Sequence, residues 1–351
     1  MGTLSRSGSR ERGPGPTWPA PDRAAPARRY VLGLMAGLPA CLARANVQER
    51  RAAVIGYLGS EMPEPYASRL KAFRGGLETA GYVEGRNLTI QFRWAEGRYE
   101  RLPALAQELV DARVALIVAA GGAPVALAAK RATASMPIVF ELGGDPVALD
   151  LVASLSRPGG NLTGISSLSV EASPKRLEFM HELFPAARTF VAVANPTSPT
   201  AERQSRELRA AAQALGLDIE ILSPRGEDEL EAVLMGYAPA RAAGVVFTSD
   251  PYFAFRSQRL AALAAAHSVP AITQTRDFAL AGGLMSYGGD FEQSHRYTGL
   301  YAGRILNGER PSDLPVQQVT KLELFLNQSS AKRLGVVFPS SLVGIADVIL
   351  D

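Results

Sequence analysis

From residue 51 onward, short apolar runs alternate with longer segments whose apolar residues recur at helical spacing. Each short run is bounded by Gly, Pro, Asn or Asp, a pattern typical of βαβ units and a parallel sheet. Strands are expected over 53–59, 88–94, 115–122, 137–142, 189–195, 218–224, 244–250, 270–275, 283–289 and 316–327. Helices are expected over 65–80, 101–112, 124–133, 198–215, 227–237, 252–267 and 291–306. The sequence therefore predicts an α/β fold.

The repeating unit occurs in two batches, which indicates two lobes. Four strands precede Gly164, and four more fall between residues 189 and 275. A polar, Ser-rich stretch at 163–176 separates them and could carry the chain from one lobe to the other. Two doubly wound, Rossmann-like lobes are therefore predicted. Ligands of such sheets bind outside the carboxyl ends of the strands, so we expect a cleft between the lobes.

Five strand-to-helix loops at this rim are rich in Gly, Pro and small polar residues: 59–60, 121–124, 143–146, 195–199 and 249–252. Glycine lets a ligand approach the backbone, and free N–H groups at a helix start favour a carboxylate or phosphate. Capping and turn chemistry is the favoured explanation of any single loop, but five equivalent loops strengthen the case for a ligand. The candidate ligand-binding residues are Ser60, Gly122, Ala123, Asp145, Asn195, Ser198, Asp250 and Gln274.

No catalytic motif accompanies these loops, because the sequence lacks a G-x-S-x-G elbow, a P-loop and a G-x-G-x-x-G fingerprint. His181, His267 and His295 fall within predicted helices and are interpreted as helix-surface residues without metal-ligand spacing. Asp145 and Asp250 could form an acid/base pair, but binding an amino group is the simpler account since nothing nucleophilic accompanies them. We expect no catalysis, no metal and no cofactor.

The first 45 residues differ in kind from the rest. A segment rich in Arg, Pro, Gly and Ser leads to an apolar run at 30–42 and then to Ala43-Arg44-Ala45. This order predicts a secretory signal peptide over 1–45, since the apolar run is shorter than the about 17 to 25 residues of a spanning helix. Cys41, the single cysteine, follows Leu-Pro-Ala as in a bacterial lipoprotein box, so lipidation there is the alternative. Export without disulfides points to a bacterial periplasm.

The leader also accounts for the basic charge of the chain. It holds seven of the 37 basic residues and two of the 34 acidic ones, which leaves 30 basic and 32 acidic residues. Because the remainder contains no basic block, nucleic acid is not an expected partner.

Three long stretches resemble one known family. They are LKAFRGGLETAGYVEGRNLTIQFRW, PIVFELGGDPVALDLVASLSRPGGNLTGIS and AGGLMSYGGDFEQSHRYTGLYAGRILNGERPSDLPVQQVTKLELFLN. The chain resembles the bacterial ABC-transporter substrate-binding proteins, which include tryptophan- and tyrosine-binding members. The resemblance implies a periplasmic-binding-protein type I fold and a monomer. It also implies capture of a small solute, such as an amino acid or related carboxylate, for a membrane permease, with no reaction catalysed.

One departure from the family concerns the rim. Such proteins typically carry Gly-Gly-Thr-Pro where this sequence has Gly121-Gly122-Ala123-Pro124. A side-chain hydroxyl is therefore missing, and any hydrogen bond it gave must come from the backbone or be lost.

The resemblance also implies how the lobes are connected. The chain would cross between them near 164–168, 282–284 and 316–320, and these three crossings would act as a hinge. The amino-terminal lobe would then comprise 51–165 and 284–316, and the carboxy-terminal lobe 166–283 and 317–351.

Three other classes of protein share two such lobes. A glycosyltransferase would need a donor-phosphate loop that the sequence lacks, and a repressor would need a helix-turn-helix that residues 1–50 cannot supply. A periplasmic sensor that hands its ligand to a signalling receptor remains open, since only neighbouring genes would separate it from a transport protein.

Overall fold

The structure is a computed structural model that describes residues 52–236 and 242–351. The predicted signal peptide and Cys41 lie outside the described residues. Within them, no helix is both long enough and apolar enough to cross a membrane.

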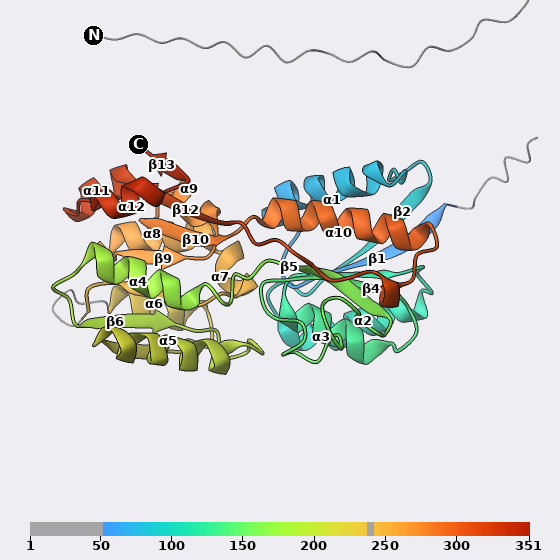
Figure 1. Ribbon diagram of the computed structural model, residues 1–351, viewed down its shortest axis with the longest axis horizontal. Helices are drawn as coiled ribbons and strands as arrows, with labels where there is room; N and C mark the ends of the chain where they lie inside the picture. Colours follow the sequence, from blue (N-terminus) through green and yellow to red (C-terminus); the bar gives the residue numbers. More distant parts are fainter. Residues whose placement is uncertain (1–51, 237–241) are drawn as a thin grey trace, which may run out of the picture. The chain divides into compact units, whose positions relative to one another are not determined.

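Strands and helices alternate along most of the chain (Figure 1). The strands are β1 (Ala53–Gly59), β2 (Leu88–Trp94), β3 (Ile117–Ala120), β4 (Ile138–Leu142), β5 (Leu162–Ser166), β6 (Thr189–Val193), β7 (Asp218–Leu222), β8 (Val245–Phe247), β9 (Ala271–Thr273), β10 (Met285–Gly289), β11 (Gln317–Gln318), β12 (Leu322–Asn327) and β13 (Val348–Leu350).

The helices are α1 (Ala67–Thr79), α2 (Leu102–Asp111), α3 (Ala123–Ala132), α4 (Ser173–Leu183), α5 (Ala201–Leu215), α6 (Glu227–Met235), α7 (Pro251–Phe255), α8 (Ser257–Ala266), α9 (Arg276–Leu280), α10 (Phe291–Leu306), α11 (Gln328–Leu334) and α12 (Ser340–Ile345). Short 3-10 helices are η1 (Glu64–Tyr66), η2 (Tyr99–Arg101) and η3 (Pro311–Asp313).

The first lobe is built on a parallel sheet. Within the described residues, six strands pair in the order β11-β5-β4-β3-β1-β2. Every residue of β3, β4 and β5 is buried, as expected for central strands with helices on both faces. Helices α2 and α3 cover one face, and α1 and α10 cover the other. The carboxyl ends of the parallel strands therefore meet at one edge of this lobe.

Helices α1 and α10 are far apart in the sequence but lie side by side (Figure 1). Glycine makes this close packing possible. A Cβ at Gly76 on α1 would lie 2.0 Å from the Arg296 carbonyl oxygen, and one at Gly299 on α10 would lie 2.0 Å from the Phe73 carbonyl oxygen. No side chain could fit at either contact, so the first lobe takes α10 as part of its core.

The second lobe is built on a sheet with the order β13-β12-β10-β9-β8-β6-β7 among the described residues. Its pairs are parallel except β10 with β12. Helices α4, α5, α11 and α12 contribute to one core cluster, and α6 to α9 contribute to another. The predicted α/β fold with two doubly wound lobes is therefore confirmed.

The chain crosses between the sheets three times, at positions that differ in part from those expected. It leaves the first sheet after β5, returns after β10 and leaves again between β11 and β12. Residues from 284 onward are expected in the first lobe, whereas β10 pairs with β9 and β12 in the second. Residues from 317 onward are expected in the second lobe, whereas β11 pairs with β5 in the first.

Two further differences arise because burial depends on tertiary packing. The Ser-rich stretch at 163–176 carries the first crossing between the lobes, as expected, but its beginning also forms the buried strand β5 and its end begins α4. His295 is expected on a helix surface, but on α10 it is fully buried, with its ring centroid 6.0 Å from that of Tyr66. Burial lowers the pKa of His295 to about 3, so its imidazole is neutral.

Candidate functional site

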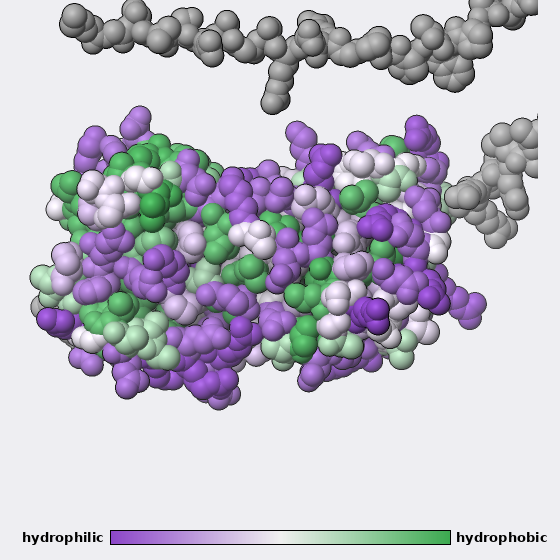
Figure 2. All heavy atoms as spheres, in the orientation of Figure 1, coloured by the Kyte–Doolittle hydropathy of each residue, from purple (hydrophilic) through white to green (hydrophobic). Residues whose placement is uncertain are grey.

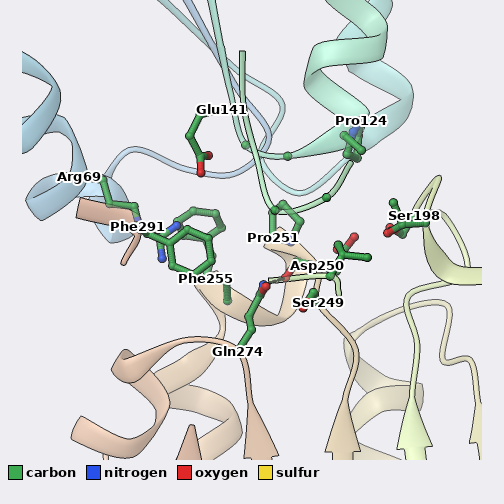
Figure 3. Close-up of a pocket in the computed structure, with 18 of the residues that line it drawn as sticks. Arg69, Pro124, Glu141, Ser198, Ser249, Asp250, Pro251, Phe255, Gln274 and Phe291 are labelled. Atoms are coloured by element: carbon green, nitrogen blue, oxygen red, sulfur yellow. Dashed lines mark hydrogen bonds between the residues drawn. The ribbon is translucent and has the colours of Figure 1, made fainter. Parts of the chain in front are cut away.

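A cavity that opens to solvent lies where loops of both lobes come together (Figure 3). The first lobe lines it with Tyr66, Arg69, Gly121, Gly122, Ala123, Pro124, Glu141, Gly143, Gly144 and Phe291. The chain beyond the first crossing lines it with Val170, Ser198, Thr200, Ser249, Asp250, Pro251, Ala254, Phe255 and Gln274. Four of the five rim loops identified in the sequence contribute to this wall.

The structure brings five of the eight candidate residues to the cavity wall. These are Gly122, Ala123, Ser198, Asp250 and Gln274. The other three, Ser60, Asp145 and Asn195, do not line it. Their positions follow from local hydrogen bonding and packing.

Asp250 is fixed by a network of hydrogen bonds. It is 2% exposed, and its Oδ1 accepts from the Asn195 side-chain amide at 2.9 Å, the Tyr252 backbone N–H at 2.9 Å and the Tyr99 hydroxyl at 2.8 Å. Gln274 donates to the Asp250 carbonyl oxygen at 3.0 Å. Burial raises the pKa of Asp250, although these hydrogen bonds oppose the rise. The carboxylate therefore caps α7 and holds its neighbours in place.

The adjacent Ser249 is held just as firmly. Its backbone N–H donates to the Gln204 side chain at 2.7 Å, and Gln204 donates back to its carbonyl oxygen at 2.9 Å. The fully buried Arg176 donates to the Ser249 hydroxyl at 2.7 Å and to the Tyr287 carbonyl oxygen at 2.9 Å. The second-lobe wall is thus a preformed scaffold.

Asp145 is engaged in its own turn. Its Oδ1 accepts from the Val147 backbone N–H at 2.8 Å, the pattern of an Asx turn across Pro146. Asn195 supports Asp250 from behind, and its Oδ1 accepts from the Thr197 N–H at 3.1 Å. Ser60 is fully buried, and a Cβ at Gly121 would come within 2.6 Å of its hydroxyl.

Glu141 lines the cavity and was not among the candidates. It precedes the last residue of β4, is 3% exposed, and points its carboxylate toward the cavity in Figure 3. Its Oε1 has no hydrogen-bond partner within residues 52–236 and 242–351. Burial raises its pKa to about 7, against an opposing effect of Arg69. A carboxylate inside the apolar run PIVFEL was the signal that could have revealed it.

Arg69 brings a buried cation to the same part of the wall. It is 6% exposed, and its guanidinium carbon lies 4.7 Å from the ring centroid of Phe255 and 4.8 Å from that of Phe291. Its ion-pair partner is Asp277, with Nη2 and Oδ2 3.6 Å apart. The ring of Tyr66 stacks on Phe255 at a centroid distance of 4.2 Å. These residues lie on helices, where sequence spacing alone predicts only packing.

Contacts between the lobes surround the cavity. Besides the Tyr99–Asp250 bond, Arg256 pairs with the buried Glu61, with Nη1 and Oε2 3.0 Å apart. Burial raises the pKa of Glu61 to about 7, while Arg256 acts to lower it. At Gly122, where φ is +81°, a Cβ would lie 2.9 Å from the Pro251 Cγ of the other lobe. The structure therefore has its lobes in contact around the cavity.

Neither a metal site nor a cluster suited to one is found among the described residues, since no three His, Cys, Asp or Glu side chains gather to hold an ion. The cavity instead offers three charged side chains, those of Arg69, Glu141 and Asp250, together with aromatic rings and backbone groups at the ends of strands. Such a set suits the binding of a small polar molecule.

Comparisons with known proteins show the family of the chain. Residues 65–349 match the family described as ABC transporter substrate binding protein. A tyrosine-binding protein of Clostridioides difficile is 26% identical over 265 residues, which cover 75% of each chain.

Two solved structures share the fold. A domain from Streptococcus pneumonia in complex with L-Trp has a TM-score of 0.76 at 23% identity, covering 85% of this chain and 99% of that one. A ligand-free, open substrate binding protein from Clostridium difficile has a TM-score of 0.59 at 25% identity, with the same coverages. The periplasmic-binding-protein type I fold expected from the sequence is thus confirmed, and the chain belongs to the ABC transporter substrate binding protein family.

Proposed function

We propose that this chain is an exported receptor of an ABC importer, which captures an amino acid or related small carboxylate between its lobes and delivers it to a membrane permease. The observation that carries the proposal is a cavity walled by strand-end loops of both lobes, since a solute bound there would hold the lobes together. The family of the chain supports the delivery step. The proposed role includes no catalysis.

The first-lobe wall supports a carboxylate as part of the solute. Helix α3 begins at Ala123 with its first turn at the cavity, and free N–H groups at a helix start favour an anion. Arg69 adds a full positive charge on the same lobe. Gly122, which precedes α3, keeps the backbone open to a ligand.

Aromatic rings support a solute that also has an apolar part. Phe255 and Phe291 reach the cavity from opposite lobes and are only partly buried. Tyrosine and tryptophan are the ligands named for the relatives above, and both carry an aromatic body on an amino-acid head. We therefore place aromatic amino acids first among the compounds to test.

The eight candidate residues differ in whether they would contact the solute. Gly122, Ala123, Ser198 and Gln274 would contact the solute directly, and Asp250 would orient its neighbours as well as line the cavity. Ser60, Asn195 and Asp145 would act from behind the wall or not at all.

The proposal includes export to the periplasm, where such receptors are generally found. Residues 1–45 would be removed during export. Mass determination of the protein from its native host should give a chain that begins at Asn46. A lipidated amino-terminal Cys41 would replace cleavage after Ala45, and an intact leader would refute export by this route.

Thermal-shift screening of the purified protein tests the binding role. The panel contains the twenty L-amino acids, their deaminated carboxylic acids and simple sugars as a contrasting class. A ligand that binds only the native state at about 100 times its Kd stabilises it by about 2.7 kcal/mol, so the melting temperature should rise. If sugars alone raise the melting temperature, or if no compound in the panel raises it, the proposed solute class is contradicted.

A further inference from the structure

Three carboxylates lie at or near the cavity, and they differ in what they already bind. Asp250 Oδ1 accepts three hydrogen bonds from protein donors, and Asp145 Oδ1 accepts one from its own turn. Glu141 Oε1 is buried without a partner among the described residues. Glu141 therefore lines the cavity with a buried oxygen that is still able to accept a hydrogen bond from a solute.

The sheet fixes the backbone position of Glu141. Strand β4 pairs with β3 and β5, and the Glu141 carbonyl oxygen accepts from the Gly122 N–H at 3.2 Å. The backbone is therefore held by the sheet, and the side chain extends toward the cavity on the side of Arg69 and the phenylalanine rings (Figure 3). A bound molecule would meet a carboxylate whose location is set in advance.

Leaving this carboxylate buried and unpaired is costly. Transfer of an ionised group from water without compensating hydrogen bonds disfavours the folded state, and buried polar groups in native proteins are nearly always paired. Arg69 is the nearby cation that acts on it, but the ion-pair partner of Arg69 is Asp277. A donor supplied by the solute would relieve the cost.

We propose that Glu141 determines the specificity of the site by accepting hydrogen bonds from an ammonium group of the solute. This inference rests on the proposed function and narrows it to amino acids, with the solute carboxylate directed to Arg69 and the first turn of α3. A solute that carries a carboxylate but no amine would leave Glu141 unpaired and would bind more weakly.

The protonation of Glu141 adds a second signature. Burial raises its pKa to about 7, so near neutral pH part of the folded protein carries an uncharged Glu141. An ammonium group pairs best with the charged form, so affinity for an amino acid should rise with pH up to and through 7. The titratable and charged groups that face Glu141 are Arg69 on α1, Tyr57 on β1 and Tyr66 on η1, and His295 on α10 lies beside Arg69.

These neighbours do not titrate in the same range. Burial raises the pKa of both tyrosines and lowers that of His295 to about 3. Glu61, whose pKa also lies near 7, is at the contact between the lobes rather than on the cavity wall. A Glu141→Gln variant therefore separates the two carboxylates, since it removes only the contribution of Glu141.

Calorimetric titration with matched ligand pairs tests the proposal. Each pair consists of an L-amino acid that binds in the screen and its deaminated acid, for example L-tyrosine and 3-(4-hydroxyphenyl)propionate. The wild type should prefer the amino acid by about ten- to a hundredfold, the range for a charged hydrogen bond. Glu141→Gln should lose most of this preference, bind the deaminated acid as the wild type does, and show no pH dependence from this group.

Asp145→Asn is the matched control, because it removes a nearby carboxylate that is already bonded to its own turn, and it should keep the full preference. The Glu141→Gln protein is taken as folded if its melting temperature is at or above that of the wild type. The preference of the wild type for one ligand of each pair tests the proposal even without a variant. If Glu141→Gln keeps the preference, or if the wild type binds only deaminated acids, the role of Glu141 is overturned while solute capture stands. If no amino acid and no carboxylate binds, the proposed function falls as well.

Discussion

The two walls of the cavity are built on opposite principles. On the second-lobe wall, Asp250 and Ser249 are satisfied by protein donors and acceptors before any solute arrives. On the first-lobe wall, Glu141 is buried with an unpartnered oxygen among the described residues, and Arg69 lies between aromatic rings. A satisfied network gives shape and rigidity, whereas an unsatisfied charge creates a requirement that only a suitable ligand meets.

This difference separates the residues that hold the site in shape from those that determine which solute binds. Replacing a member of the second-lobe network should cost stability first. Replacing Glu141 should cost selectivity and leave the fold as stable as before, or more so.

Asp250→Ala should have the largest effect. It leaves the Tyr99 hydroxyl, the Asn195 amide and the Tyr252 N–H without their acceptor. The free energy of unfolding should fall by about 3 to 5 kcal/mol, since buried donors lose charge-assisted bonds. Urea denaturation measures the change. A loss below about 1 kcal/mol would show that Asp250 does not organise its wall.

Glu141→Gln should act in the opposite direction on stability at high pH. The folded-state pKa near 7 lies above the ordinary value of 4.5, so the unfolded state loses its proton first and wild-type stability falls as pH rises from about 4.5 to 7. The variant removes this contribution, worth up to roughly 3 kcal/mol at pH 8.

Denaturation curves of both proteins at pH 5 and pH 8 check this prediction. Glu61 contributes a fall of the same sign in each protein, so the difference between them reports on Glu141 alone. A variant less stable than the wild type at pH 8 would mean that Glu141 has a partner that stabilises the fold.

The lobes and their strand-end loops were predictable because hydrophobic periodicity and loop composition are local signals. Glu141 and Asp145 show where such signals end. Both are acidic residues near the end of one strand, and loop composition favours Asp145 as the candidate because it lies in the loop. The side-chain direction is decided by the sheet for Glu141 and by the turn at Pro146 for Asp145.

Burial was harder to predict than element type. Strand β5 overlaps the polar stretch that carries the chain to the second lobe, yet it is fully buried because it pairs between β4 and β11. His295 is buried because α10 is taken into the first lobe through the Gly76 and Gly299 contacts. Both outcomes depend on residues far away in the sequence.

Charged side chains on the surface of the protein play no part in the difference between the two cavity walls. Figure 2 shows hydrophilic residues over much of one face, with hydrophobic groups between them. Their surface ion pairs, such as Arg206 with Glu202, are exposed and each contributes at most about 1 kcal/mol. The functional contrast therefore concerns the buried charges around the cavity.

Tyr99→Phe should weaken solute binding by about tenfold, or about 1.5 kcal/mol, because its hydroxyl links the first lobe to Asp250. The change in thermal stability without solute should be smaller, since the bond joins the lobes rather than either core. Calorimetry gives the affinity, and small-angle scattering gives the compaction on adding solute. An unchanged wild-type radius of gyration at saturating solute would contradict closure of the lobes.

Asp145→Ala should have the smallest effect on the site. Loss of the bond to the Val147 N–H should lower the free energy of unfolding by about 1 kcal/mol, within the range for a lost capping bond. Affinity for the solute should be unchanged in the folded protein. A tenfold loss of affinity with full stability would instead mean that Asp145 contacts the solute, and Glu141 and Asp145 would then no longer differ in role.

A crystal structure with the bound solute tests the contrast between the walls most directly. The account predicts a nitrogen donor of the solute within about 3 Å of the Glu141 carboxylate, with the hydrogen bonds of Asp250 to Asn195 and Tyr252 intact. It would be contradicted by a solute whose amine binds Asp250 in place of these donors while Glu141 stays without a partner.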